Sequence, residues 1–182
     1  MARTIVSGLF LALFVLFAGS QSGAEETAIS FPVEGRHGMV VTGQELATRE
    51  AVSVLKNGGN AVDAAVTAAF VMAVTLPRAG NIGGGGFMLI YDARKKETIA
   101  LDFWQKAPSA ATRGMFVGKD GRVDPKSSRE SHRAVAVPGT VAGLALALTK
   151  YGTLSLDKAM APAIRYAENG FVMNVGICAD IR

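Results

Sequence analysis

Apolar residues recur at helical spacing between Ala47 and Leu55, and charged residues lie on the opposite side of that stretch. The glycines that follow Asn57 should end this helix, because glycine readily adopts the left-handed conformation of a helix C-terminus. The next segment, Ala61–Val74, is almost entirely apolar around one acid, Asp63. This pattern predicts a helix that is buried on every side, with the carboxylate near the positive end of the helix dipole.

Two strands and a long loop are expected next. Phe87–Tyr91 and Thr98–Phe103 have the composition of β-strands, and the charged segment between them predicts a hairpin turn. Residues 107–130 are rich in Pro, Gly, Ser, Lys and Arg and show little periodicity. Such a composition predicts a long excursion over the surface.

Two further helices are predicted near the end of the chain. The first covers Val141–Leu148. The second starts at Ser155, a good N-cap residue, and ends at Asn169, just before a glycine. Pro162 lies inside the second helix and should kink or divide it, because proline lacks the amide hydrogen that a helix interior requires.

The first residues have the layout of a secretory signal peptide. Arg3 is followed by an uncharged apolar run, Ile5–Ala18, and then by small residues that offer a cleavage site after Ala24. The run is shorter than the roughly 20 residues that cross a bilayer, so no stable membrane anchor is expected. We therefore expect a signal peptide in 1–24, an irregular segment in 25–37 and the start of the mature domain in 38–182. This layout predicts export to the periplasm or the exterior.

The composition favours a folded domain and argues against nucleic-acid binding. Of the 182 residues, 49% are apolar and 19% are charged, which is enough for a packed core. The net charge is +4, but the only dense basic run, Arg94–Lys96, has no aromatic residues interleaved with it. The single cysteine, Cys178, cannot form a disulfide within the chain. We expect it to be buried or incidental rather than a nucleophile.

Four successive glycines, Gly83, Gly84, Gly85 and Gly86, precede the first predicted strand. Their spacing fits neither a dinucleotide-binding loop nor a P-loop, and they join a helix to a strand rather than a strand to a helix. Two roles remain open. We favour a close backbone crossing that only glycine permits, and the alternative is direct contact with a ligand.

His37 and His132 are the only histidines in the sequence. Neither is accompanied by a cluster of Cys, Asp or Glu, so no metal site is expected. Ser131 precedes His132, but adjacent residues rarely form a nucleophile and base pair. We expect both histidines to be structural or surface residues, and we expect no cofactor.

Taken together and in order, these segments resemble the opening part of gamma-glutamyltranspeptidases. The resemblance extends from about Gly38 to Asn174. Each motif is short, but the whole series in register is specific. The motifs are Gly58–Ala65, Pro77–Leu89, Leu101–Phe103, Ala107–Pro108, Ala110–Thr112, Ser131–His132, Val137–Gly143 and Lys150–Thr153.

The resemblance implies an α/β (α+β) fold, the αββα sandwich of N-terminal-nucleophile hydrolases, incomplete in this chain. Precursors of this family cut themselves into a large and a small subunit. The new N-terminal threonine of the small subunit then attacks gamma-glutamyl amides, with its own α-amine as the base. The family cuts before a threonine in a Thr-Thr-His context, and no Thr-Thr pair occurs in these 182 residues. We therefore expect no catalytic residue here, and no activity from this chain alone.

One departure from the family lies at the implied substrate site. After Asp102-Phe103 the family has Arg-Glu, and that arginine binds the α-carboxylate of the glutamyl group. Here the two positions hold Trp104 and Gln105. Tryptophan cannot form the ion pair. Lys106 offers a point charge nearby, although neighbouring strand residues point to opposite faces. A purely structural interpretation makes Trp104 a core aromatic.

The main hypothesis is the N-terminal part of a gamma-glutamyltransferase and glutathione hydrolase. Its expected partners are glutathione or other gamma-glutamyl compounds and the family's small subunit. The tryptophan at position 104 favours one alternative, an acylase of the same fold that acts on another amide. The other alternative is a secreted, non-catalytic remnant. Because strands with missing neighbours have open edges, the isolated mature chain is expected to aggregate or to stay partly molten.

Overall fold

The structure, a computed structural model, describes residues 33–173 and 175–180. The predicted signal peptide lies outside these residues, and the described part of the irregular segment, 33–37, contains no helix or strand. Residues 1–34 and 35–182 form two units, and every described element belongs to the second. In chain order the elements are α2 (Glu45–Lys56), α3 (Ala61–Thr75), β1 (Phe87–Asp92), β2 (Glu97–Asp102), α4 (Pro125–Glu130), η1 (His132–Ala134), α5 (Thr140–Tyr151), α6 (Leu156–Asn169) and α7 (Val175–Asp180).

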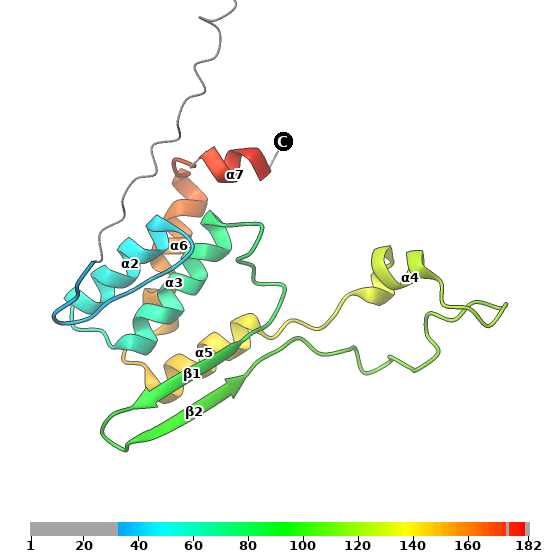
Figure 1. The fold of residues 1–182 in the computed structure, drawn as a ribbon, viewed down its shortest axis with the longest axis horizontal. Helices are drawn as coiled ribbons and strands as arrows, with labels where there is room; N and C mark the ends of the chain where they lie inside the picture. The colour runs from blue at the N-terminus through cyan, green and yellow to red at the C-terminus, as the bar shows by residue number, and fades with distance from the viewer. Residues whose placement is uncertain (1–32, 174, 181–182) are drawn as a thin grey trace, which may run out of the picture. The chain divides into compact units, whose positions relative to one another are not determined.

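Helix α3 is the central element of the second unit, as its uniformly apolar sequence predicted. It contacts α2, α5 and α6 (Figure 1). Its N-terminus is fixed by a capping box. The Asn60 side chain accepts hydrogen bonds from the backbone N–H groups of Val62 and Asp63, and the Asp63 carboxylate accepts one from the N–H of Asn60.

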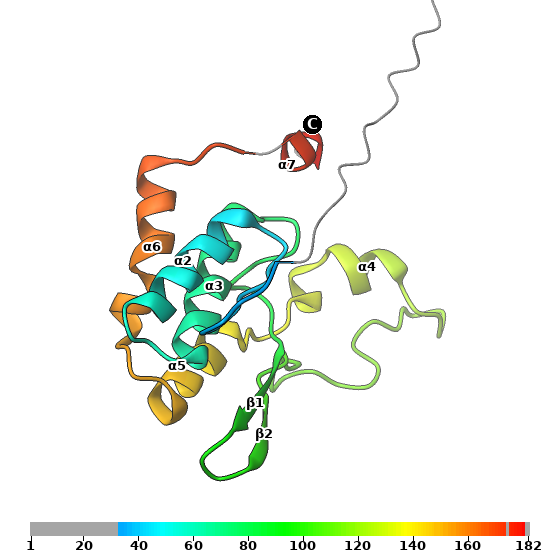
Figure 2. The same cartoon turned by 60° about the vertical axis from the view of Figure 1, so that its left-hand side comes forward.

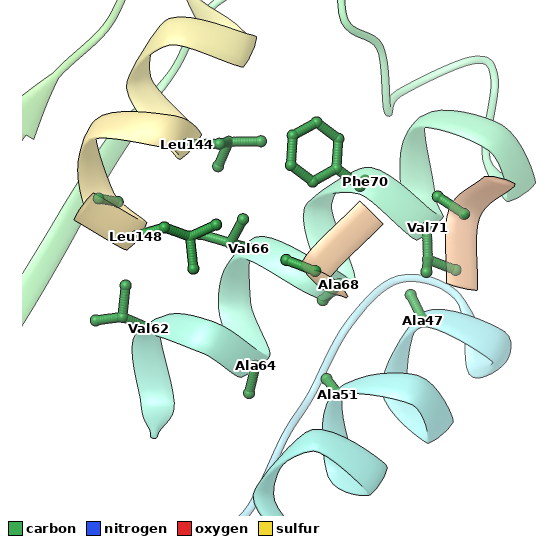
Figure 3. Packing of buried hydrophobic residues seen from close by; sticks show 13 residues of the cluster. Ala47, Ala51, Val62, Ala64, Val66, Ala68, Phe70, Val71, Leu144 and Leu148 are labelled. Atoms are coloured by element: carbon green, nitrogen blue, oxygen red, sulfur yellow. The ribbon is translucent and has the colours of Figure 1, made fainter. Parts of the chain in front are cut away.

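The neighbours of α3 pack on different sides of it. Figure 3 shows Val66 and Phe70 of α3 directed towards Leu144 of α5. On another side, Ala47 and Ala51 of α2 are completely buried. Alanine adds only a methyl group to the contact surface, so α2 and α3 can approach each other closely. The core therefore includes large side chains between α3 and α5 and small ones from α2, and α6 adds the buried residues Ala159 and Ala163.

Strands β1 and β2 form an antiparallel hairpin, with Phe87 opposite Asp102 and Tyr91 opposite Thr98. Both predicted strands are confirmed: β1 ends one residue later than predicted, and β2 starts and ends one residue earlier. Because side chains alternate between the two faces of a strand, the hairpin has an inner and an outer face. The inner face packs against the helical core through Met88 and its neighbours, which are Ile90, Leu101 and, just beyond β2, Phe103. Figure 2 shows the hairpin as a two-stranded element beside α5.

The predicted surface excursion is present, but it contains elements that the sequence analysis missed. A backbone bridge between Lys106 and Val137 closes its base, with N···O distances of 3.1 and 2.8 Å. Near its end, α4 begins with Pro125, and the Asp124 side chain accepts hydrogen bonds from the first free N–H groups. An aspartate followed by proline is a common helix start, so this helix could have been predicted.

Helix α6 runs unbroken from Leu156 to Asn169, and Pro162 does not divide it. Pro162 is buried together with Ala159 and Ala163, so packing of this face holds the helix together despite the missing amide hydrogen bond. Ser155 is the N-cap residue, as predicted, but its hydroxyl makes no capping hydrogen bond to the backbone. Helix α7 was not predicted. Within the described ranges, no helix is long and apolar enough to cross a membrane.

Candidate functional site

The turn after β2 carries the sequence-predicted substrate residues. The Asp102 carboxylate accepts a hydrogen bond of 2.9 Å from the backbone N–H of Trp104 and so fixes the start of this turn. Trp104 is 51% exposed, so the interpretation of this residue as a core aromatic is wrong. Its ring stacks on Phe87 with a centroid distance of 5.4 Å and an interplanar angle of 12°.

The two residues after Trp104 have different environments. Gln105 is half-buried, and its side-chain Oε1 is a buried atom without a hydrogen-bond partner among the described residues. Lys106 is exposed, and its backbone pairs with Val137 at the base of the surface excursion. The two predicted substrate residues and the neighbouring Lys106 therefore follow one another directly after β2, and Trp104 contacts Phe87 across the hairpin.

The glycine run lies directly against this turn. The N–H of Phe103 donates to the carbonyl oxygen of Gly86 at 3.0 Å, and the N–H of Gly139 donates to that of Gly84 at 2.8 Å. A Cβ on Gly85 would lie 2.6 Å from the Phe103 carbonyl oxygen and still closer to the nitrogen of Gln105. Only a residue without a Cβ fits at position 85, because the backbone of the turn occupies the space.

Glycines from the start of α5 complete the same crossing. A Cβ on Gly143 would overlap the Phe103 ring, and one on Gly139 would overlap the Phe103 carbonyl. Gly83 differs, because a Cβ there would meet nothing within 4 Å. Three segments distant in sequence thus meet at the turn that carries Trp104 and Gln105.

Among the described residues, the histidines, Ser131 and Cys178 are not part of a cluster of catalytic or metal-binding side chains. His37 and His132 are exposed, as expected for surface histidines. The Ser131 hydroxyl donates to the Ser127 carbonyl oxygen at 2.5 Å and is not paired with His132. In the part of the chain that the structure describes, no three His, Cys, Asp or Glu side chains gather as a metal site would require. Cys178 is a partly buried free thiol.

Asp63 has a role that the sequence analysis missed. Its buried carboxylate accepts hydrogen bonds from the N–H groups of Asn60 (2.8 Å), Thr153 (2.7 Å) and Leu154 (2.9 Å), and from the Thr153 hydroxyl (2.7 Å). Burial acts to raise the pKa of Asp63, but the hydrogen bonds from Leu154, Asn60 and Thr153 outweigh it and hold the pKa below its ordinary value. An acid within an apolar helix needs such partners. The Asn60-x-x-Asp63 spacing is the signal from which a capping box could have been predicted.

A pocket of about 650 Å³ lies beside this network, at the other end of the hairpin from Trp104. Its lining comes from the start of α3, the hairpin turn and the segment after α5, and it includes Asn60, Arg94 and Tyr151. None of the predicted substrate residues or glycines of the run lines this pocket. The candidate site at Trp104 is therefore distinct from it.

Comparison with known proteins shows to which family the chain belongs. Residues 47–182 match the family model described as Gamma-glutamyltranspeptidase. The chain is 48% identical over 160 residues to the Glutathione hydrolase proenzyme of Escherichia coli (strain K12), which covers 88% of this chain and 27% of that protein. It is 37% identical over 156 residues to the Acylase ACY 1 proenzyme of Pseudomonas sp. (strain SE83), covering 82% of this chain and 28% of that protein. The chain thus spans about a quarter of the length of these relatives.

The fold leads to the same family. The crystal structure of Helicobacter pylori gamma-Glutamyltranspeptidase superposes with a TM-score of 0.79 at 45% identity, covering 82% of this chain and 43% of that chain. The predicted fold class, part of the mixed α and β architecture of N-terminal-nucleophile hydrolases, is confirmed by this similarity. On the match of its sequence and of its fold, the chain belongs to the gamma-glutamyltranspeptidase family.

Proposed function

We propose that this chain forms the N-terminal part of a gamma-glutamyltransferase and glutathione hydrolase that is made as a precursor and acts after export. The observation that carries the proposal is the 48% identity to a glutathione hydrolase proenzyme over nearly all of the chain. The apolar run after Arg3 supports export. In this proposal the small subunit of the processed precursor is the partner of this chain.

The proposed reaction proceeds through an ester on the N-terminal threonine of that small subunit, outside these 182 residues. The threonine oxygen bonds to the γ-carbonyl carbon, and the hydroxyl proton passes through the threonine α-amine to the departing amine as the C–N bond breaks. Water or an acceptor amine then attacks the ester carbonyl, and the threonine oxygen leaves and regains a proton. Water gives the free acid, whereas an acceptor amine gives a new amide.

Within this chain, the turn after β2 is the proposed contribution to substrate binding. Trp104 and Gln105 stand where the family resemblance implies glutamyl recognition. The crossing of the glycine run with Phe103 and Gly139 supports this role, because a turn held by backbone on two sides keeps its side chains in place.

The exposure of Trp104 favours a second candidate function, an acylase that acts on an amide without an α-carboxylate. An indole ring cannot form a bidentate ion pair with a carboxylate, as a guanidinium does. Its large exposed ring instead favours an apolar acyl group. The similarity to the Acylase ACY 1 proenzyme supports this candidate as well.

A chimaera tests the proposal with a complete catalytic segment supplied by a relative. Residues 47–182 replace the aligned part of the Escherichia coli proenzyme, and the product is assayed for self-cleavage and for glutamate release from glutathione. We expect self-cleavage, and a kcat/KM for glutathione that rises about tenfold or more when Trp104→Arg restores the ion pair.

Self-cleavage serves as the control for folding in both versions of the chimaera. A chimaera that cleaves itself but releases no glutamate even with Trp104→Arg would refute the glutathione hydrolase proposal. Turnover of a carboxylate-free amide by the same protein would instead establish the acylase. Sequencing the reading frame beyond the codon for Arg182 is the complementary test, because a Thr-Thr-His stretch in frame is required for the proposed nucleophile.

A further inference from the structure

Residues 104–105 lie where the chain changes its backbone partner. Just before them, the N–H of Phe103 donates to the carbonyl oxygen of Gly86 at 3.0 Å. Just after them, the backbone of Lys106 pairs with that of Val137. Between these two pairings, neither residue takes part in a backbone–backbone hydrogen bond within the described part of the chain. The path of this two-residue segment is therefore not set by a β-ladder.

The Asp102 carboxylate provides a partner for the backbone of this segment. Its Oδ1 accepts a hydrogen bond of 2.9 Å from the N–H of Trp104. Asp102 is the last residue of β2 and lies opposite Phe87, so the hairpin register holds the carboxylate in place. An ionised acceptor also bonds a backbone N–H more strongly than a neutral acceptor does. The direction of the chain at position 104 thus depends on a side chain that is fixed in the strand.

This hydrogen bond determines where the side chain at position 104 points. Residues two positions apart lie on the same face of a strand, and Trp104 accordingly stacks on Phe87, the partner of Asp102 in the register. On the other side of the segment, a Cβ on Gly85 would overlap the backbone nitrogen of Gln105. The segment is therefore confined by a carboxylate at its start and by backbone behind it.

We propose that Asp102 is a positioning residue of the substrate site, whose carboxylate orients the side chain at position 104 and so controls substrate binding without touching the substrate. This inference rests on the proposed function, because that function places position 104 at the glutamyl group. The carboxylate acts on a backbone N–H, which every residue except proline possesses. Asp102 therefore orients an arginine at position 104 in the same way as it orients the tryptophan.

The hairpin contains a matched control for a purely structural role. Asp92 is the last residue of β1, and its Oδ1 accepts a hydrogen bond from the N–H of Arg94, also at 2.9 Å. Asp92 in addition pairs with Lys95, so its removal takes away no fewer contacts than the removal of Asp102. The two carboxylates make the same contact at opposite ends of the hairpin. If stabilising the hairpin were the whole role of Asp102, the two acids would be equally important for activity.

The test uses the Trp104→Arg version of the chimaera in which residues 47–182 replace the aligned part of the Escherichia coli proenzyme. Asp102→Ala should raise KM for glutathione about tenfold, because the guanidinium loses its orientation. The same variant should change kcat by less than about twofold, as expected when binding alone is weakened. Asp102→Asn keeps an acceptor oxygen and should restore KM to within about threefold of the parent.

Asp92→Ala should leave both kinetic constants unchanged, and self-cleavage reports on the folding of every variant. Equal increases in KM for Asp92→Ala and Asp102→Ala would overturn the inference, because the hairpin as a whole would then be responsible. A fall in kcat at constant KM would overturn it as well.

A second measurement does not depend on turnover. Trp104 is the only tryptophan of the chain, so the difference in emission between the chimaera and its Trp104→Phe version reports on this ring. Asp102→Ala should change the difference spectrum, and Asp92→Ala should not. An unchanged spectrum for Asp102→Ala would overturn the inference even if KM rises.

The two measurements together separate this inference from the proposed function. A changed spectrum with an unchanged KM would show that Asp102 orients position 104 without an effect on substrate binding, and would overturn its role at the site. Chimaeras that cleave themselves but release no glutamate would refute the proposed function. The emission of Trp104 would then still decide whether Asp102 orients the residue.

Discussion

At the scale of single residues, the Asp63 carboxylate connects the start of α3 to the segment between α5 and α6. Its four hydrogen bonds come from residues 60, 153 and 154, so two parts of the chain about ninety positions apart in sequence depend on one side chain. Three of the donors are backbone N–H groups, one from Asn60 at the start of α3 and two, from Thr153 and Leu154, in the segment that follows α5. The ionised form is favoured here, because every partner of the carboxylate is a donor.

Asp63→Asn should therefore destabilise the protein by about 2 kcal/mol, since the amide group would turn a donor towards another donor. The measurement is the urea unfolding midpoint, at neutral pH, of the chimaera in which residues 47–182 replace the aligned part of the Escherichia coli proenzyme. Asp157→Asn, an exposed acid in the first turn of α6, serves as the control and should shift the midpoint much less. Equal losses for the two variants would show that the network contributes nothing specific.

The same carboxylate predicts a pH dependence. The pKa of Asp63 in the folded protein lies below the ordinary value of 3.8, so its contribution to stability is complete above that value and is lost as the pH falls through the lowered pKa. The difference in unfolding free energy between wild type and Asp63→Asn should accordingly shrink below pH 3.8. A difference that grows on acidification would contradict this assignment.

At the scale of elements, the glycine run, the turn after β2 and the start of α5 cross at backbone contact distance. Phe103 is at the centre of this crossing, with Gly86 and Gly143 against its ring and Gly139 against its carbonyl group. Four successive glycines therefore serve packing at several positions. Whether the glycine run also contacts a ligand is a separate question. A substitution at Gly83, where a Cβ would have open space around it, addresses this question.

Gly85→Ala and Gly83→Ala are a matched pair that addresses both roles. Gly85→Ala should destabilise the protein by about 1–3 kcal/mol, because the methyl group would overlap the backbone of the turn. Gly83→Ala should have little effect on thermal unfolding, because its surroundings are open and its φ is not positive. If Gly83→Ala lowers activity while stability is unchanged, the run contacts the ligand. A stable Gly85→Ala protein would contradict the crossing.

At the scale of the whole molecule, the outer face of the hairpin is an apolar surface that the described helices leave uncovered. Phe87, Leu89 and Tyr91 are each at least 65% exposed. Both strands have a free edge as well, since the sheet in the described part of the chain contains only β1 and β2. Such edges and faces promote association between chains.

Residues 35–182 in isolation should therefore aggregate or unfold in a broad transition. Near-UV circular dichroism during heating, together with binding of a hydrophobic dye, tests this, and a sharp cooperative transition would contradict it. The variant Leu89→Lys on the outer face should reduce aggregation with no loss of helix content. Its neighbour Ile90 faces the core, and Ile90→Lys should instead unfold the chain.

The sequence by itself determined most elements of this protein. Periodicity located α2, α3, α5, α6 and the hairpin, because the repeat of apolar residues is a local property of the chain. It placed the buried helix at the centre, and the series of motifs identified the family and fold that the comparisons confirmed. It did not decide between a kinked and a divided helix at Pro162, since the packing that keeps α6 in one piece around a proline is not visible in local preferences.

Only the tertiary structure decided what individual side chains do. The partners of Asp63 come from a segment about ninety residues away, so its sequence neighbours could not reveal them. The stacking of Trp104 on Phe87 likewise depends on the register of the hairpin and on the turn at Asp102. Sequence patterns record which residues prefer to be buried. Which residues meet is decided by the path of the backbone, and here that path decided between the two interpretations of Trp104, because it leaves the ring exposed and stacked on Phe87.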